Sequence, residues 1–271
     1  AVRIYIDNQQ VYEYGYERML AHKTVGSGSQ FINFPDEYKG KTLKIQWDLA
    51  ENNAFTKFDP IRIYGWENAY RSLLTENRLP LFLGCFLVIF GFSTLLITAF
   101  AIVISAKYAR ILCISAFCIC MGLWTLCYYN LLLIFSMPLY LICLLEYISL
   151  YLAPLPLLIY LREDVTALNR PIMYVIYRIL FILQSAATTC FLAIHALNLV
   201  HFTETLKYMQ ILILCHLIYF VIVEFMNLQI SQKLVHRLFL LGMLLLSSCV
   251  GYDLVFYYFD RYRGITISST K

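Results

Sequence analysis

Apolar and polar residues alternate over the first quarter of the chain and then give way to long apolar runs. In residues 1–65, short stretches rich in β-branched and aromatic residues are separated by turn residues, a pattern typical of strands that bury one face. The expected strands cover residues 2–6, 11–14, 31–34, 42–47 and 61–64. We therefore predict an extracellular antiparallel β-sandwich, truncated and jelly-roll-like, whose first strands would lie upstream of Ala1.

The rest of the chain predicts membrane-spanning helices. A helix needs about 20 mostly apolar residues to cross the core of a bilayer. Six such runs cover residues 79–106, 111–129, 137–161, 171–197, 207–226 and 237–258. The loops between them are short, so we expect a compact α-helical transmembrane bundle over residues 79–258, entered through an amphipathic connector at 66–78. Residues 259–271 are expected to form an outer loop that leads to a seventh helix beyond Lys271.

Composition supports this division. Of the 271 residues, 61% are hydrophobic and only 14% are charged, which excludes a soluble globular or a disordered protein. The net charge of +4 indicates membrane topology rather than nucleic-acid binding. Six basic residues border three alternating loops: Lys107, Arg110, Arg162, Arg170, Lys233 and Arg237. The positive-inside rule then places these loops in the cytoplasm and residues 1–65 outside the cell, in a multi-pass protein of the plasma membrane.

The nine cysteines all follow residue 78 and lie within apolar runs. Cys118 and Cys120 are separated by one residue, which is not the spacing of a zinc site. The cysteines are therefore interpreted as small packing residues, and we expect no disulfide framework, no metal and no cofactor.

Several segments in both halves of the chain together resemble one receptor family. They are Tyr5-Ile6-Asp7, Val11-Tyr12, 31–35, 38–45 and 61–65 in the first quarter, and 122–124, 147–152 and 154–156 in the apolar part. The chain resembles the bacterial seven-transmembrane receptors with diverse intracellular signalling modules (7TMR-DISM).

The resemblance implies an external sensory domain, a seven-helix bundle and a cytoplasmic output module. That module is most often a diguanylate cyclase with a GGDEF motif and less often a histidine kinase. The resemblance also implies a homodimer and an unknown small-molecule or protein signal. The sequence departs from the pattern, because the first strands, the seventh helix and the output module are absent from it. It contains no GGDEF or kinase residues, so the resemblance assigns no catalytic residue.

Ionisable residues within the apolar runs are costly and need an explanation. Glu146 and Asp253 fall in the outer half of the predicted bundle, His195 lies near an outer helix end, and His216 lies near mid-depth. One hypothesis is that these four residues line an outward-opening cavity that binds a ligand or a proton. The alternative is that each is separately satisfied by a tyrosine, serine or threonine hydroxyl or by a backbone carbonyl.

Two further features concern the predicted helices themselves. Near the cytoplasmic ends, Arg178 and Glu224 form an interhelical ion pair or reach separately to the interface. Pro154 and Pro156 remove backbone donors and predict a kink in the third helix, which is either a signalling hinge or a purely structural bend.

These features favour a sensory receptor over two alternatives. A small transporter would show internal repeats and polar residues along a continuous path, and neither is evident. A membrane enzyme would show a metal set, a catalytic triad or a phosphate loop, and the five histidines are scattered. We expect no catalytic turnover from these 271 residues.

Overall fold

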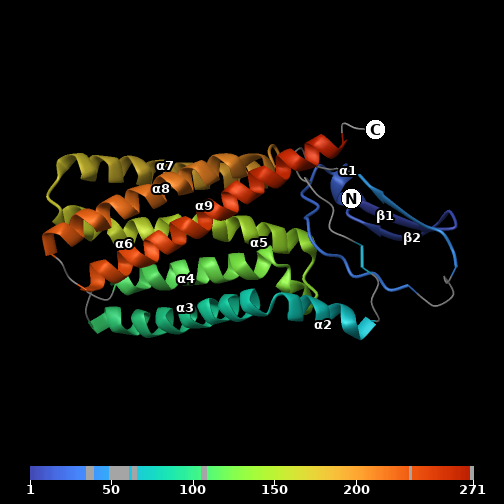
Figure 1. The fold of residues 1–271 in the computed structure, drawn as a ribbon, viewed down its shortest axis with the longest axis horizontal. Helices are drawn as coiled ribbons and strands as arrows, with labels where there is room; N and C mark the ends of the chain where they lie inside the picture. The colour runs from blue at the N-terminus through green and yellow to red at the C-terminus, as the bar shows by residue number, and fades with distance from the viewer. Residues whose placement is uncertain (35–39, 49–60, 63–65, 105–108, 232–233, 269–271) are drawn as a thin grey trace.

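The computed structural model describes residues 1–34, 40–48, 61–62, 66–104, 109–231 and 234–268. It shows a long helical bundle with a small β-sheet at one end (Figure 1). The start of α4 (Ala109–Tyr128), the end of α6 (Pro154–Ala167) and the start of α9 (Leu234–Ser268) lie at the opposite end from the sheet, and we call these two ends the basic end and the sheet end.

The first described element is a β-hairpin. Strands β1 (Val2–Ile6) and β2 (Gln9–Tyr14) pair antiparallel, and β3 (Leu43–Trp47) pairs with the other edge of β1. Asp7 and Asn8 form the tight turn, with φ values of 46° and 70°. Positive φ at both positions is the geometry that two-residue hairpins favour, and Asp and Asn tolerate it. The predicted first hairpin is thus present.

The predicted sandwich is not confirmed, because the described residues form a single sheet of order β2-β1-β3. Residues 31–34 are not a strand: Phe31 packs instead on Tyr70 of helix α2 (Trp66–Glu76), with 4.8 Å between ring centroids. Residues 61–62 are likewise not a strand, and 63–64 lie outside the described residues. A short helix, α1 (Tyr16–Leu20), follows β2 and was not predicted.

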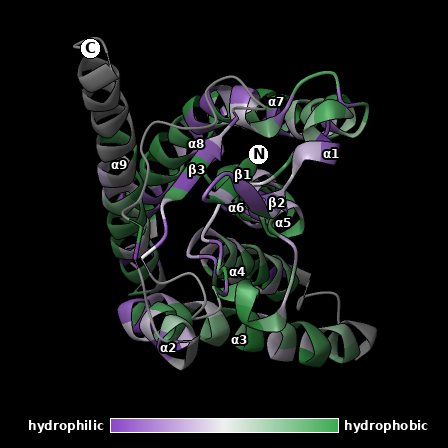
Figure 2. Ribbon diagram, turned by 90° about the vertical axis from the view of Figure 1, so that its right-hand side faces the viewer, coloured by the Kyte–Doolittle hydropathy of each residue, from purple (hydrophilic) through white to green (hydrophobic). Residues whose placement is uncertain are grey.

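The bundle consists of long helices joined by short connections. Their bounds are α3 (Arg78–Ile104), α4 (Ala109–Tyr128), α5 (Leu139–Leu152), α6 (Pro154–Ala167), α7 (Pro171–Ala196), α8 (Phe202–Ser231) and α9 (Leu234–Ser268), with a 3₁₀ turn at Leu131–Phe135. Apolar residues dominate these helices, whereas polar residues gather on the strands (Figure 2). Many large apolar side chains of α3, α7, α8 and α9 are exposed, as expected for helices whose outer faces contact lipid tails.

Five crossings are long and apolar enough to span a membrane in the part of the chain that the structure describes. They cover Arg78–Ala101, Arg110–Tyr128, Leu139–Ala167, Pro171–Ala196 and Phe202–Ile230. The predicted sixth crossing is not confirmed, because the apolar stretch of α9, His236–Tyr252, falls short of that length. The predicted outer loop at 259–271 is wrong over 259–268, which continue α9. The chain is therefore a multi-pass membrane protein with a small polar domain at one end.

Two clusters of buried residues hold the bundle together. One lies towards the sheet end and contains Cys143, Tyr147, Tyr151, Phe202 and Met209. The other lies towards the basic end and joins α6, α7, α8 and α9, around side chains such as Leu158, Phe220 and Met243. Both clusters are built around the α5–α6 pair, which therefore forms the centre of the fold (Figure 1).

Candidate functional site

Helix α1 and the segment that follows it contact the bundle through Arg18 and Thr24, and we call this contact the junction. The guanidinium of Arg18 lies 3.7 Å from the ring centroid of Tyr140 at the start of α5. The Thr24 hydroxyl lies 3.1 Å from Nδ1 of His201, just before α8. A cation–π contact of this kind contributes about 0.5–2 kcal/mol, depending on its solvation. The junction thus joins the domain to the first turns of two long helices.

Local contacts shape the segment that makes the junction. The Tyr14 hydroxyl donates to the carbonyl of Val25 (3.0 Å), and Nε of Arg18 donates to the carbonyl of Thr24 (2.8 Å). Burial raises the pKa of the Tyr14 phenol, so Tyr14 remains a donor at neutral pH. Gly26 has a φ of +87°, and a Cβ there would lie 2.6 Å from the backbone of Leu139. Only glycine permits this close approach between two backbones.

Aromatic rings continue from the junction into the bundle. His195, at the end of α7, stacks on Phe202 with 3.8 Å between ring centroids, and its centroid lies 5.9 Å from that of His201. Phe202 in turn contacts Tyr147 (5.3 Å) and Tyr151 (5.4 Å) of α5. Residues of α5, of the end of α7 and of the start of α8 therefore meet on one aromatic side chain.

The α5–α6 break is stabilised by polar groups from two other helices. Pro154 and Pro156 have no N–H, so the carbonyls four residues earlier, those of Leu150 and Leu152, lose their helical donors, and Tyr151 lies between these two residues. The carbonyl of Tyr151 accepts hydrogen bonds from Nε2 of Gln184 (2.9 Å) and from the hydroxyl of Thr188 (3.1 Å), both on α7.

The Tyr151 side chain makes a second set of contacts at the same level. Its hydroxyl lies 2.9 Å from the hydroxyl of Thr205 on α8. We call Tyr151, Gln184, Thr188 and Thr205 the kink cluster, and all four are buried. A single residue at the break thus binds α7 through its backbone and α8 through its side chain.

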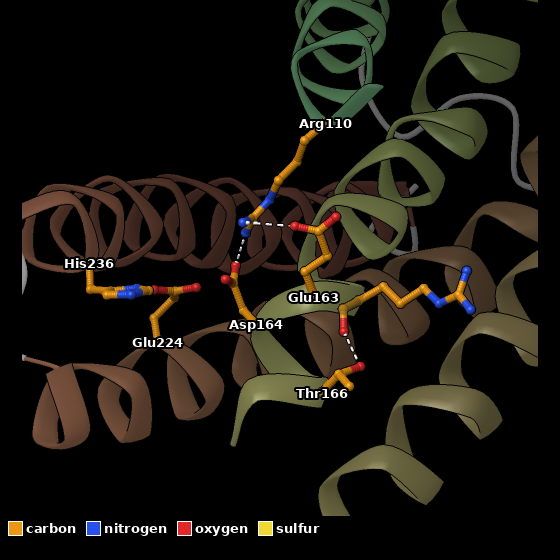
Figure 3. A network of polar contacts seen from close by, with 7 residues as sticks. Arg110, Glu163, Asp164, Thr166, Glu224 and His236 are labelled. Carbon is orange, nitrogen blue, oxygen red and sulfur yellow. Dashed lines mark hydrogen bonds and ion pairs between the residues drawn. The ribbon is translucent and has the colours of Figure 1, made fainter. Parts of the chain in front are cut away.

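A second polar group, the basic-end cluster, comprises Arg110, Glu163, Asp164, Glu224 and His236 (Figure 3). Arg110 of α4 pairs with Asp164 of α6 and, at 3.4 Å, with Glu163. Glu224 of α8 lies 3.0 Å from Nδ1 of His236 on α9. Glu224 also interacts electrostatically with Asp164 and Arg110, so the two pairs form one network. Four helices therefore meet in this cluster.

The structure does not bring together the three predicted cavity residues whose side chains it describes, Glu146, His195 and His216. Glu146 on α5 interacts electrostatically with Cys127 on α4. His195 stacks at the junction side of Phe202, and Nδ1 of His216 lies 2.5 Å from the carbonyl of Leu212 in its own helix. Among the described residues, no hydrogen bond, ion pair or ring contact joins any two of these three.

The side chain of Asp253 lies outside the described residues. Elsewhere in the described chain, no group of three His, Cys, Asp or Glu side chains is placed to hold a metal ion.

The predicted partner of Glu224 was wrong. Glu224 pairs with His236 of α9, whereas the Arg178 side chain is exposed on α7. Glu224 points into the bundle and is 1% exposed, so an arginine on the outer surface of α7 does not reach it.

The predicted break at Pro154 and Pro156 lies where α5 ends and α6 begins.

Sequence reasoning missed Tyr151, Gln184, Arg110 and Asp164. Arg110 and Asp164 were counted as loop residues because each lies just outside an apolar run. One signal was present in the sequence: a glutamine in mid-run on α7 needs a buried partner, and two prolines on the neighbouring helix leave carbonyls without donors.

The fold and these clusters define a polytopic helical membrane protein in which polar contacts tie one terminal domain to a broken helix and then to the opposite end. Comparison with family models, with curated proteins and with solved structures finds no match for the chain.

Proposed function

We propose that the chain is the membrane sensory region of a receptor, which carries an extracellular or intramembrane signal to a cytoplasmic output module. The observation that supports this proposal is the junction, where Arg18 and Thr24 contact Tyr140 and His201 at the starts of α5 and α8. A signal that shifts the N-terminal domain acts directly on the two helices that meet at Tyr151. Transmission then corresponds to a shift in population between two packings of the bundle.

The path beyond the junction supports the same proposal. The helix that starts beside Tyr140 breaks at Pro154 and continues as α6, whose last turn carries Asp164, the partner of Arg110 on α4. Breaks of this kind absorb changes of backbone angle, so they are suitable hinges. On the resemblance to the 7TMR-DISM receptors, we propose that the output is a diguanylate cyclase, that the full protein is a homodimer in the plasma membrane, and that the signal is a small molecule or a protein.

The decisive experiment weakens the junction without removing a charged or aromatic side chain. Gly26→Ala adds one methyl group that must displace the backbone of Leu139, whereas Gly40→Ala adds the same methyl at a similar φ of +79° with no described atom within 4 Å. In cells that express the full gene, Gly26→Ala is expected to change the cyclic di-GMP level by about fivefold or more, since allosteric coupling is commonly about 1–3 kcal/mol. Gly40→Ala is expected to leave it unchanged.

Protein amounts are compared by immunoblot of the membrane fraction. Equal cyclic di-GMP in both variants and the wild type, at equal amounts of protein, would contradict the proposal. Autophosphorylation in place of a cyclic di-GMP response would redirect it to a histidine kinase.

The proposed orientation is tested by cysteine labelling. Ala167 is exposed at the basic end, and Lys23 is exposed beside the junction. An impermeant maleimide is expected to label Lys23→Cys in intact cells and Ala167→Cys only after permeabilisation. The unmodified chain, whose cysteines lie in the apolar helices, measures the background. Labelling of Ala167→Cys in intact cells would reverse the assigned topology.

A further inference from the structure

The strongest unassigned feature is the charge balance of the basic-end cluster. The Glu224 side chain is 1% exposed and the Asp164 side chain is 12% exposed. The Glu163 side chain is 73% exposed, so water solvates its charge. Arg110 supplies one positive charge for the two buried carboxylates. Buried charges are costly unless they are paired, so among the described residues these two carboxylates lack one positive charge.

The remaining partner is His236, whose Nδ1 lies 3.0 Å from Glu224 (Figure 3). Imidazole changes its charge between about pH 5 and 8, which makes it the natural source of the missing charge. We propose that Glu224 and His236 form a proton-binding site, and that the bound proton fastens the start of α9 to the bundle. This proposal goes beyond the sensory function and does not depend on it.

Three other helices contribute charged or titratable groups to this balance in the described part of the chain. The titratable and charged groups that face it are Arg110 from α4, Tyr160 and Asp164 from α6, and His236 from α9. The Tyr160 ring carries the Arg110 guanidinium at 4.2 Å on one side and stacks on Phe239 of α9 at 5.2 Å. The same residues that set the charge at Glu224 therefore also contact α9.

Besides the charge balance, the position of His236 in its helix makes its positive charge depend on Glu224. His236 lies in the first turn of α9, where the positive end of the helix dipole opposes a cation. When the site is protonated, the two carboxylates face two cations and α9 stays docked. When it is deprotonated, Glu224 keeps a buried negative charge, and Arg110, which already pairs with Asp164, is the one cation left among these residues. This imbalance favours separation of α9 from α8. We thus expect α9 to loosen at this end of the bundle as the pH there rises.

The test measures the distance between α6 and α9 as a function of pH. Spin labels are attached to keto amino acids introduced at Ala167 and at Leu238, both exposed, so the native cysteines are left intact. In the full chain in lipid nanodiscs, the distance between labels is expected to lengthen by about 2 Å and to broaden between about pH 5 and 8, the scale of a helix shift. A distance that does not vary with pH would overturn the proposal.

Variants of the two residues separate proton binding from packing. Glu224→Gln carries no charge to balance and is expected to hold the short distance at every pH, as is His236→Arg, which supplies a permanent charge. His236→Gln is expected to hold the long distance. Glu163→Gln, a change of the same chemistry on an exposed carboxylate, is expected to keep the wild-type transition. Persistence of that transition in Glu224→Gln or His236→Gln would assign it to another group and overturn the proposal.

Discussion

Replacement of Tyr151 by alanine is expected to lower the free energy of unfolding of the bundle by about 3–5 kcal/mol, the range for removal of a fully buried aromatic ring. Tyr151 is 0% exposed, and its ring contacts Phe191 at 6.2 Å and Phe202 at 5.4 Å. In a membrane this loss is one of packing and hydrogen bonding, because lipid tails are as apolar as the core. The cavity would lie beside the α5–α6 break, where neighbouring backbone donors are already missing.

The measurement is reversible unfolding of the purified chain in mixed micelles, followed by the fluorescence of its three tryptophans and by circular dichroism. Tyr151→Phe separates the ring from the hydroxyl and is expected to cost only about 1 kcal/mol, because it removes the bond to Thr205. Tyr128→Ala removes the same ring from a position that is 54% exposed, and a small effect is expected there. Equal losses at Tyr151 and Tyr128 would show that the kink cluster is not a centre of stability.

The existence of the helices could be predicted from the sequence, because a backbone in hydrocarbon must satisfy its own hydrogen bonds. The runs at 79–106, 111–129 and 171–197 agree with α3, α4 and α7 to within two residues at each end. The runs at 137–161 and 207–226 were too short. Apolar length marks the hydrocarbon layer, whereas α6 and α8 continue through polar turns that include Asp164 and Glu204.

The partners of the buried polar residues could not be predicted. A helix such as α8 is apolar on all sides, so no hydrophobic stripe shows which face is inside. The sequence placed Glu146 in the outer half of the bundle and His216 near mid-depth. Depth does not fix the rotation of a helix about its axis, and in the structure the two side chains contact different neighbours. For the same reason the sequence left open whether Glu224 pairs with Arg178 or reaches to the interface, and its partner is on α9.

The strand prediction failed for a different physical reason. Residues 31–34 have a strand-like composition, yet Phe31 is used to cover the connector helix through Tyr70. An apolar composition indicates that a side chain will be buried. It does not indicate whether that side chain will pack as part of a strand or against a helix.

A close helix contact carries the second large effect. Where α3 crosses α4, glycines face backbone atoms of the partner helix: a Cβ at Gly122 would lie 2.9 Å from both the carbonyl oxygen of Gly84 and the backbone nitrogen of Val88. Small residues at such crossings let two helices approach and gain dispersion contacts that lipid does not replace. Gly122→Ala is therefore expected to destabilise the bundle by about 1–3 kcal/mol, the usual cost of overpacking. The sign of the change in stability is informative. Helix preference alone would make the alanine variant more stable by about 1 kcal/mol, so a loss of stability reports the close contact.

The chain offers a matched control for that sign. Gly242 lies within α9, and no described atom lies within 4 Å of a Cβ added there. Gly242→Ala is expected to be neutral or to stabilise the protein by up to about 1 kcal/mol, since only the helix preference acts. Both variants are unfolded under the same conditions as Tyr151→Ala. If Gly122→Ala were as stable as Gly242→Ala, α3 and α4 would not be in backbone contact in the folded protein.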